Sequence, residues 1–393
     1  MLRVSSSGAG DPMKVLVLGA GLQGGAAAFD LLRNPDVEQV GLADVNAGHL
    51  DQVRARLGDR RVAVHEMDVS DSERMVQLLH GYDACLCAVN YWYNLELTRA
   101  AIEAGTHFCD LGGNNDVVAQ QLKLDDDAAA AGVLVVPDCG LAPGMANILA
   151  AHGIRKLDET SAVRIRVGGL PLHPEPPLDY QRVFAVEGLI NEYVERAVIV
   201  RDGVKLSVEP LTETEEIEFP EPFGKLEAFH TSGGLSTLPR TFAGCVRDMD
   251  YKTIRYPGHC AKIRPLLELG FFDAKPLRVG EQEVIPRQFS ARLLETVLPE
   301  SGPDVVLVRV TVVGTKFGGR RRLEYEIVDY HDSSHHMSAM MRCTAFPASI
   351  VAQMMADGRI DRRGVVPQEV CVPADAMIDE LEKRGIHVVQ RQS

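Results

Sequence analysis

The sequence predicts an α/β protein, with an N-terminal Rossmann domain built on a doubly wound parallel sheet and an α+β domain with a mostly antiparallel sheet after it. Apolar, β-branched runs alternate with helical segments as far as residue 136, and a glycine cluster follows the first run. Beyond Gly144, strand-like runs follow one another and are joined by turn residues. We therefore place a Rossmann domain at 13–142, a substrate-binding and dimerisation domain at 143–345, and a C-terminal helical segment at 346–393 that packs back on the Rossmann domain.

The alternation in the first half is regular. The first strand, Lys14–Leu18, stops at the glycine cluster, and the helix after it, Gln23–Arg33, ends at the breaker Asn34-Pro35. Further strands are predicted at Val37–Ala43, Val62–His65, Ala84–Ala88, His107–Asp110 and Val133–Val136, and helices at Asn46–Leu57, Ser72–Leu79, Leu95–Ala104 and Val118–Ala131. Parallel strands need crossover connections of this kind, because each helix carries the chain back to the start of the sheet.

The second half has a different pattern. Asp202-Gly203 lies between two strand-like runs, as a hairpin turn would. Long β-type runs, Asp304–Lys316 and Leu323–Tyr330, are joined at a Gly-Gly turn, and one helix is predicted at Pro257–Leu269. The closing segment is helical again at Ala348–Met355 and Ala374–Lys383.

The composition is that of an ordinary globular protein, with 46% hydrophobic and 24% charged residues among 393. A formal net charge of −14 would repel a phosphate backbone, so we expect no nucleic acid as a partner. No apolar run approaches the roughly 18 residues of a membrane span, and residues 1–12 do not have the pattern of a signal peptide. The eight cysteines form no CxxC pair, which favours reduced thiols in a cytoplasmic protein.

The glycine cluster has the pattern of a dinucleotide-binding loop. Gly19, Gly21 and Gly24 form GxGxxG, with Leu22 and Gln23 between the last two, directly between a strand and a helix. The first glycine permits the tight turn, the second lets the backbone approach a pyrophosphate, and the third lets helix and strand pack closely. The alternative is a purely structural glycine turn.

An acid follows at the end of the second strand. Asp44, 20 residues after Gly24, should accept the ribose hydroxyls of NAD, and no Lys or Arg follows it to hold a 2′-phosphate. We therefore expect NAD as the cofactor, although Asp44 could instead cap the next helix. Asp68 after the third strand could meet the adenine or cap a helix, and Ala88, Val89 and Asn90 follow the fourth strand at the edge where ligands lie.

Longer motifs follow in order along the rest of the chain. They are Cys109–Gly113 (CDLGG), Pro137–Ala150 (PDCGLAPGMANILA), Val167–Tyr180 (VGGLPLHPEPPLDY), Leu226–Arg240 (LEAFHTSGGLSTLPR), Tyr251–His259 (YKTIRYPGH) and Arg362–Glu369 (RRGVVPQE). With the Rossmann start they cover most of the chain. On these motifs the sequence resembles the saccharopine dehydrogenase family, most of all its lysine 6-dehydrogenase members.

The resemblance implies a two-domain enzyme that forms a homodimer or a higher homo-oligomer and binds a small amino-acid substrate between its domains. Members that cleave saccharopine carry an Arg-Gly pair after the GGLP motif, which binds a substrate carboxylate. Here the matching stretch reads Phe184–Gly188 (FAVEG), and Glu187 stands where the base would be. This departure favours a substrate that presents an amine. The expected reaction is the NAD-dependent oxidative deamination of L-lysine at Cε to allysine, which cyclises, with release of ammonia.

Such a reaction needs a base for the amine and a cation for the α-carboxylate. His259, at a predicted helix start, is the first candidate for the base, and Asp110 and Glu187 are the acids expected to meet the ammonium groups. Arg255 is the best cation for the carboxylate, with Arg240 in reserve. His230, Thr231 and Ser232 are further candidates for substrate binding. Each has a structural alternative: His259 could cap its helix, Arg255 could pair with an acid, and Glu187 could be solvated.

Other hypotheses remain open on the sequence. His331, His335 and His336 near Asp332 suggest a metal site, but they lie in a polar turn and hydride transfer needs no metal, so we expect none. A saccharopine dehydrogenase, or a relative that acts on another secondary amine or diamino acid, would need several arginines in its pocket. A protein that senses NAD without chemistry is a third possibility.

Overall fold

In this computed structural model of the chain, residues 12–183, 185–300 and 302–393 are described, so the expectation for the N-terminal extension lies largely outside the described residues. The chain divides into two compact units. The first unit combines the chain up to Gly144 with Thr344–Met377, and the second combines Met145–Cys343 with Ile378–Ser393. The C-terminal segment that we set at 346–393 is therefore shared between the two units.

The first unit is built on a seven-stranded sheet in the order β17-β6-β5-β4-β1-β2-β3, and every pair in it is parallel. From β1 the chain goes to β2 on one side and later reaches β4 on the other side, so the strand order reverses at β1. The strands are β1 (Met13–Leu18), β2 (Val37–Asp44), β3 (Val62–Glu66), β4 (Ala84–Cys87), β5 (His107–Asp110), β6 (Leu134–Val136) and β17 (Gly364–Val365).

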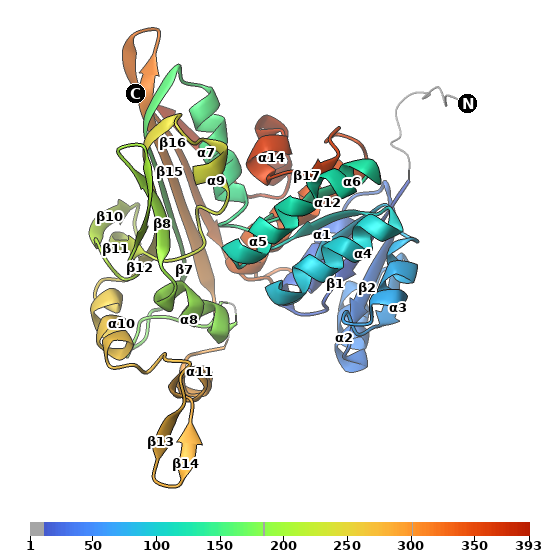
Figure 1. The fold of residues 1–393 in the computed structure, drawn as a ribbon, viewed down its shortest axis with the longest axis horizontal. Coiled ribbons are helices and arrows are strands. Elements are labelled where there is room, and N and C mark those ends of the chain that lie inside the picture. Colours follow the sequence, from blue (N-terminus) through green and yellow to red (C-terminus); the bar gives the residue numbers. More distant parts are fainter. Residues whose placement is uncertain (1–11, 184, 301) are drawn as a thin grey trace. The chain divides into compact units, whose positions relative to one another are not determined.

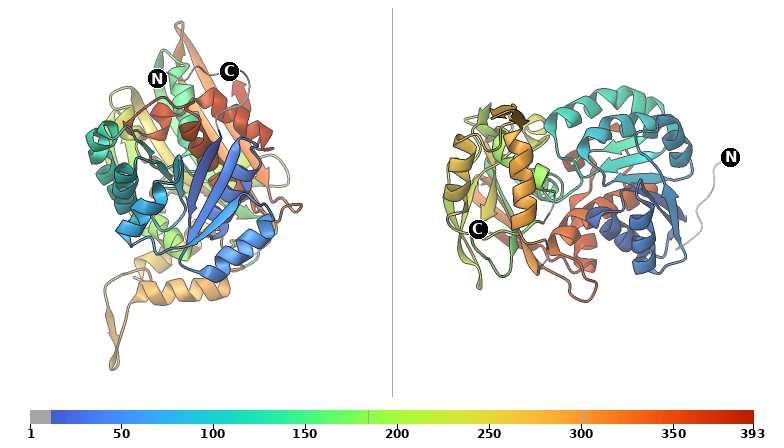
Figure 2. Two further views of the ribbon diagram at one scale, coloured as in Figure 1. Left: turned by 90° about the vertical axis from the view of Figure 1, so that its right-hand side faces the viewer. Right: turned by 90° about the horizontal axis from the view of Figure 1, so that it is seen from below.

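Helices cover both faces of this sheet (Figures 1 and 2). They are α1 (Leu22–Leu32), α2 (Ala47–Leu57), α3 (Ser72–Leu79), α4 (Asn94–Ala104), α5 (Asn115–Gln121), α6 (Asp125–Ala130) and α13 (Gln368–Cys371), with short 3-10 turns η1 (Tyr91–Tyr93) and η2 (Leu122–Leu124). The predicted helix Val118–Ala131 is divided into α5, η2 and α6. Asp125, Asp126 and Asp127 occupy the first turn of α6, where acids favour the start of a new helix.

The second unit contains a nine-stranded sheet whose main path is β10-β11-β12-β7-β15-β16-β18, with β8 paired to β12 and β9 paired to β8. Only the described pair β12–β7 is parallel, so the sheet is mostly antiparallel as predicted. The strands are β7 (Glu159–Pro171), β8 (Ala197–Arg201), β9 (Val204–Val208), β10 (Glu215–Phe219), β11 (Gly224–His230), β12 (Val246–Arg255), β15 (Asp304–Lys316), β16 (Gly319–Tyr330) and β18 (Val389–Gln392).

The helices of the second unit are α7 (Met145–Arg155), α8 (Val186–Val194), α9 (Leu238–Thr241), α10 (His259–Glu268) and α11 (Pro286–Val297). A small hairpin of β13 (Leu277–Val279) and β14 (Gln282–Val284) extends beyond α11 as an arm (Figure 1). Two helices, α12 (Ala339–Ala356) and α14 (Ala374–Lys383), run from one unit into the other. Helix α12 begins nine residues before the predicted Ala348, because Asp304 accepts the backbone N–H groups of Ala339 and Met340 and so caps the earlier start.

The sheet of the second unit is strongly curved. Arg166 of β7 pairs with Glu215 of β10, and Arg309 of β15 donates from Nη2 to the carbonyl of Glu218 at 2.8 Å. Because β10 is not a neighbour of β7 or β15 in the sheet, the sheet must curve so that β10 lies over the face of β7 and β15. A buried apolar cluster that includes Leu226, Ile254 and Leu307 fills the space beneath.

No helix in the described part of the chain is both long enough and apolar enough to span a membrane.

Candidate functional site

The glycine loop between β1 and α1 has the geometry that a dinucleotide requires. Gly19 has a φ of +97°, and a Cβ there would lie 2.9 Å from the carbonyl oxygen of Ala88. A Cβ on Gly24 would lie 1.8 Å from the carbonyl oxygen of Gly19. Packing therefore excludes a side chain at both positions. A Cβ on Gly21 would meet nothing within 4 Å, so this position is open to a ligand.

The other predicted cofactor residues lie at the same edge of the sheet. Ala88 donates its N–H to the carbonyl of Leu18 at 2.8 Å, which holds the segment after β4 beside the end of β1. Val89 is half-buried, and Asn90 is exposed where η1 begins. Because the strand order reverses between β1 and β4, this edge is the switch point where open α/β sheets bind ligands.

Asp44 ties the glycine loop to the end of β2. Its Oδ2 accepts the N–H of Ala20 at 2.7 Å, and its Oδ1 accepts the N–H of Asn46 at 2.8 Å. The cap of α2 is Asn46, whose side chain accepts the N–H of His49 at 3.2 Å, so capping does not need Asp44. Each carboxylate oxygen keeps a lone pair that could accept a ribose hydroxyl.

The remaining candidates in the first turn of α1 and after β3 have simple surroundings. Leu22 is exposed and Gln23 is half-buried at the start of α1. Asp68 is exposed and accepts the N–H and the hydroxyl of Ser70 at 2.9 and 2.7 Å, which lowers the pKa of Asp68. The cap of α3 is Asp71, so Asp68 shapes the turn before the helix.

Asp110 is a buried acid with three donors. Its Oδ1 accepts the N–H groups of Gly112 and Asp138 at 2.8 and 3.1 Å, and its Oδ2 accepts Nε2 of Gln121 at 2.8 Å. Burial raises the pKa of Asp110, and these hydrogen bonds offset part of the effect. In the first unit Asp110 therefore orders the loops after β5 and β6.

In the second unit, Arg255 is the centre of a buried aromatic cluster. The residue is 3% exposed. Its Nε donates to the hydroxyl of Tyr193 at 3.2 Å, its Nη1 donates to the carbonyl of Ile254 at 2.9 Å, and its guanidinium carbon lies 4.8 Å from the ring centre of Tyr180. The Nη2 atom faces Glu192, whose Oε2 is 3.7 Å away. A cation held in this way has a fixed orientation.

His259, the first residue of α10, adjoins this cluster and is buried. Its Nδ1 lies 2.9 Å from the carbonyl of Leu178 and its Nε2 lies 3.0 Å from the hydroxyl of Tyr193. A carbonyl can only accept, so Nδ1 carries the proton and Nε2 accepts from Tyr193. Burial and then the charge of Arg255 lower the pKa of His259 to about 3, which keeps the ring neutral. Both ring nitrogens are engaged, so His259 positions Tyr193 and through it Arg255.

Glu192 is the acid of the cluster. It lies on α8 next to Tyr193, with its side chain 29% exposed. Burial raises the pKa of Glu192 to about 7, although the nearby charge of Arg255 lowers it. The surrounding side chains include the phenols of Tyr180 and Tyr251, whose pKa values are also raised by burial. The pKa of Glu192 therefore lies above that of an ordinary glutamate.

The other predicted substrate residues are divided between two faces of the sheet. Thr231 shares a hydrogen bond of 2.7 Å with Thr253, whose hydroxyl lies 3.4 Å from that of Tyr251, so Thr231 adjoins the aromatic cluster. Ser232 donates its N–H to the carbonyl of Glu192 at 3.2 Å and fastens the loop to α8. His230 points to the opposite face.

Three of the residues that the sequence suggested for the substrate or catalytic site therefore do not lie beside Arg255. His230 is buried with Nδ1 3.2 Å from the carbonyl of Tyr251 and Nε2 3.3 Å from Glu213. Arg240 is exposed on α9. Glu187 is half exposed and pairs with Arg287, whose Nε and Nη2 lie 2.9 and 2.8 Å from its Oε2. In the structure Glu187 therefore belongs to the surface of α8.

In α8 the acid that faces Arg255 is Glu192, and not Glu187, which the sequence suggested as an acid for an ammonium group. Val186, Leu189, Ile190 and Tyr193 are the buried residues of this helix, at helical spacing. Glu192 stands beside the last of them, whereas Glu187 lies at the other end of the helix on its solvent side. The signal was present, since an acid next to a buried tyrosine is a better candidate than an acid in the first helical turn.

The described residues contain no group of three or more His, Cys, Asp or Glu side chains that could hold a metal ion. His335 instead pairs with Asp332 at 2.8 Å, and His331 lies 3.7 Å from Asp304.

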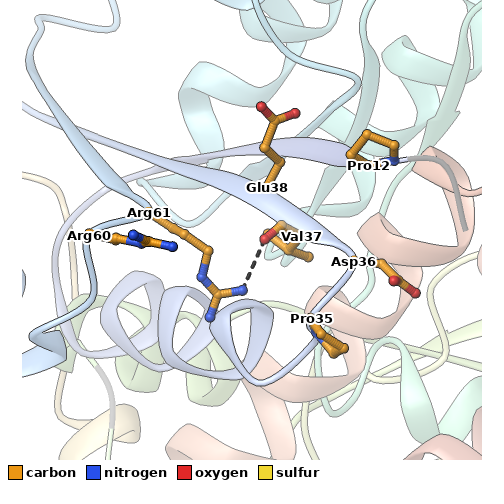
Figure 3. A pocket seen from close by; sticks show the side chains of 7 residues that line it. All are labelled: Pro12, Pro35, Asp36, Val37, Glu38, Arg60 and Arg61. Carbon is orange, nitrogen blue, oxygen red and sulfur yellow. Dashed lines mark hydrogen bonds between the residues drawn. The ribbon is translucent and has the colours of Figure 1, made fainter. Parts of the chain in front are cut away.

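An open hollow of about 500 Å³ lies on the first unit at the start of β2, at the other end of this strand from Asp44. Its lining residues are labelled in Figure 3. Arg61 at this hollow donates to the carbonyls of Asn34 and Val37, each at 3.0 Å, and pairs with Asp59. The guanidinium thus holds the turn before β2, and the hollow has no part in the dinucleotide site.

Family models match both halves of the chain. Residues 15–136 match the saccharopine dehydrogenase NADP binding domain, and residues 140–386 match the saccharopine dehydrogenase C-terminal domain. The chain belongs to the saccharopine dehydrogenase family. It is accordingly an oxidoreductase with a domain for a pyridine nucleotide, of a family whose members act on amino acids and amines.

Several family members align over most of their length. The carboxyaminopropylagmatine dehydrogenase of a Synechocystis species is 24% identical over 95% of this chain and 96% of its own. The saccharopine dehydrogenase [NADP(+), L-glutamate-forming] of Schizosaccharomyces pombe is 20% identical over 82% of this chain and 87% of its own. The solved apo saccharopine dehydrogenase (L-Glu forming) of Saccharomyces cerevisiae has a TM-score of 0.78 at 18% identity and covers 97% of this chain and 100% of that chain. This likeness confirms the predicted fold.

Proposed function

We propose that this family member is an NAD-dependent dehydrogenase that deaminates L-lysine at Cε. The observation that carries the proposal is the charge content of the aromatic cluster in the second unit. Among the described residues, Arg255 is the cation that contacts Tyr180, Tyr193 and Glu192, and Glu192 is its acidic partner. One cation and one acid suit a substrate with a single carboxylate and an amine.

The reaction balances with water as the second reactant. Lysine, NAD⁺ and water give allysine, NADH, ammonium and a proton: a hydride leaves Cε, and water then replaces the nitrogen. When bound, the nicotinamide supplies the hydride acceptor. Arg255 holds the α-carboxylate, and the rings of Tyr180 and Phe229 beside His259 form an apolar wall. The phenol of Tyr193 and the imidazole of His259 keep Arg255 in place.

The choice of NAD rests on the end of β2. A 2′-phosphate would meet the carboxylate of Asp44, and the next residues are the exposed Val45 and Asn46. The name of the matching family domain includes NADP, so the preference needs a direct test. We expect a higher kcat/KM with NAD than with NADP. Val45→Arg should shift this ratio toward NADP because it supplies a cation for the phosphate.

A second candidate is the oxidation of a secondary amine. Relatives carry such names as carboxyaminopropylagmatine dehydrogenase and saccharopine dehydrogenase. The pair of Arg255 and Glu192 would also hold one amino-acid arm of a secondary amine whose other arm is a cation. Saccharopine has three carboxylates and would require further cations beside Arg255.

The test follows the absorbance of the reduced nicotinamide with purified protein, NAD or NADP, and L-lysine at alkaline pH. Saccharopine and a guanidino-tailed secondary amine are assayed in parallel. The proposal expects reduction that depends on lysine, with one ammonium released for each NADH. Turnover of a secondary amine without lysine turnover would move the function to the second candidate. If none of the three compounds leads to reduction of the cofactor, both candidate functions are contradicted, and NAD sensing without chemistry is left.

A further inference from the structure

The guanidinium of Arg255 has an unused side. Its Nε and Nη1 are occupied by Tyr193 and by the carbonyl of Ile254, at 3.2 and 2.9 Å. Its Nη2 makes no hydrogen bond with a described residue, and the facing Oε2 of Glu192, at 3.7 Å, is beyond hydrogen-bond distance. Arg255 is 3% exposed. The N–H groups on its Nη2 thus point toward the carboxylate of Glu192, which is too far away to accept a hydrogen bond from them.

The carboxylate of Glu192 is equally unused. Its side chain accepts no hydrogen bond from a described residue, and Arg255 is the cation that faces it. The titratable groups around it are Arg255 and Tyr251 on β12, Tyr180 in the loop after β7, and Tyr193 on its own helix. Two opposite charges therefore lie side by side in a largely apolar setting, each with hydrogen-bonding capacity to spare.

The short distance between these groups determines which part of a substrate they can hold. In an α-amino acid the carboxylate and the ammonium are attached to the same carbon, so the two charges are separated by about two bonds of roughly 1.5 Å. In lysine the distal nitrogen is four further methylene groups away. A donor and an acceptor 3.7 Å apart can serve the two charges of one head group, and they cannot serve opposite ends of an extended lysine.

We propose that Arg255 and Glu192 together form a receptor for the zwitterionic head group of an α-amino acid. Arg255 binds the α-carboxylate through Nη2, and Glu192 binds the α-ammonium. The head group lies alongside the pair and bridges two side chains that are too far apart to bond to each other. The assignment of the distal amine as the reacting end rests on the proposed function, but recognition of the head group does not.

The raised pKa of Glu192, about 7, agrees with this geometry. Burial makes the bare carboxylate costly, and a substrate ammonium would supply the missing counter-charge. The orientation of Arg255 is already fixed by the chain of hydrogen bonds through Tyr193 to His259, so binding need not order the guanidinium.

The experiment is calorimetric binding of unreactive ligands to the full chain in the presence of NAD. L-Norleucine has the head group and no distal amine, hexanoate has the carboxylate alone, and pentylamine has an amine alone. Norleucine should bind at least roughly tenfold more tightly than either, since it makes both charged hydrogen bonds. Glu192→Gln should weaken norleucine by roughly tenfold or more and leave hexanoate unchanged. Arg255→Gln should weaken both.

Glu216→Gln removes an exposed acid of the same unit, which pairs with Lys225 at 3.0 Å, and serves as the matched control. Its norleucine affinity should equal that of the wild type. Thermal unfolding of each variant shows that it is folded. Equal losses for norleucine and hexanoate in Glu192→Gln, or no loss for norleucine, would overturn the receptor.

These outcomes are separable from those of the proposed reaction. Norleucine binding that depends on Glu192, without any lysine-dependent NADH, would keep the receptor and reject lysine deamination. Lysine turnover with an unchanged KM in Glu192→Gln would keep the reaction and reject the receptor.

Discussion

At the residue scale, burial and the nearby charge of Arg255 keep His259 neutral, and its hydrogen bonds fix the position of its proton. With Nδ1–H donated to Leu178 and Nε2 accepting from Tyr193, a second proton on the ring would remove the acceptor that the Tyr193 hydroxyl uses. Burial raises the pKa of Tyr193 to about 12, so the phenol stays protonated and remains the donor. Arg255, His259 and Tyr193 thus form one unit in which only the guanidinium is charged.

The lowered pKa of His259 predicts a specific acid sensitivity. The unfolded chain takes up a proton near the ordinary pKa of about 6.5, and the folded chain does so only near about 3. Stability from this group is therefore complete above pH 6.5 and is lost as pH falls toward 3, by about 1.4 kcal/mol per pH unit. Unfolding of His259→Gln by urea should show a flatter pH profile over this range than the wild type. Parallel profiles would contradict the neutral histidine.

The pKa of Glu192 is shifted in the opposite direction from that of His259, and its effect is measured by ligand binding. Its pKa is raised to about 7, so the carboxylate that should hold an α-ammonium is present only above that pH. Norleucine affinity should rise with pH below 7, by up to about tenfold per unit, and level off above it. Glu192→Gln should remove this dependence, as measured by calorimetry between pH 5.5 and 8.5. A pH-independent affinity in the wild type would count against Glu192.

The glycine loop offers a test that separates packing from binding. A methyl group at Gly21 meets nothing within 4 Å, so Gly21→Ala should unfold at the wild-type temperature. Its KM for NAD should rise by roughly tenfold or more, because the methyl occupies the path of the pyrophosphate. Gly24→Ala, with its Cβ 1.8 Å from the carbonyl of Gly19, should instead lose stability. An unchanged KM in Gly21→Ala would show that the dinucleotide lies elsewhere.

At the element scale, the last strand of the parallel sheet depends on two residues far apart in sequence. Asp125 at the start of α6 accepts the N–H of Val365 at 2.9 Å, and β17 pairs with β6. Gly364 has a φ of +102°, and a Cβ there would lie 2.1 Å from Oδ1 of Asp125. The edge of the sheet is therefore fixed where the C-terminal segment joins it.

Gly364→Ala should accordingly destabilise the protein by more than about 2 kcal/mol, because backbone strain and the contact with Asp125 add. Gly358→Ala is the matched control: its φ is +79°, and a Cβ meets nothing within 4 Å. That change should cost about 1 kcal/mol from the backbone alone. Chemical unfolding measures both. Equal losses would mean that the β17 edge carries little of the stability.

Elements with a strong local pattern could be predicted from the sequence. The helix Ser72–Leu79 and the strand Asp304–Lys316 have the predicted bounds, since capping and alternation mark them locally. The break between α5 and α6 and the early start of α12 were missed. The start of α6 has no side-chain cap that could mark it in the sequence, and for α12 the capping residue Asp304 is 35 residues away.

In the candidate site too, residues within a local sequence pattern could be predicted, and residues brought together by the fold could not. Gly19–Gly24 and Asp44 could be proposed as cofactor residues because they lie within one strand-loop-helix unit and the next strand. The partners of Arg255 come from α8 and the loop after β7, and no short spacing connects them to it. Arg255 and His259 were proposed from a motif, and Glu192 became a candidate only once the fold placed it beside Arg255.

At the scale of the whole molecule, the proposed reaction assigns a different task to each unit. In this proposal the open glycine loop and Asp44 of the first unit serve the pyridine nucleotide, and the buried Arg255 and its neighbour Glu192 in the second unit serve the amino acid. The homodimer expected from the family resemblance stays a prediction.

The activity should rise toward alkaline pH, because the reacting amine, with an ordinary pKa of about 10.4, must be neutral.

The central claim is that a hydride leaves Cε of lysine for the nicotinamide, and isotope transfer tests it most directly. The protein is incubated with NAD and L-lysine that carries two deuterium atoms on Cε, and the reduced cofactor is analysed by mass spectrometry. We predict NADH that contains one deuterium, with an equal amount of ammonium and a slower rate than with ordinary lysine when hydride transfer limits turnover. Reduced cofactor without deuterium, or no reduction at all, would contradict the account.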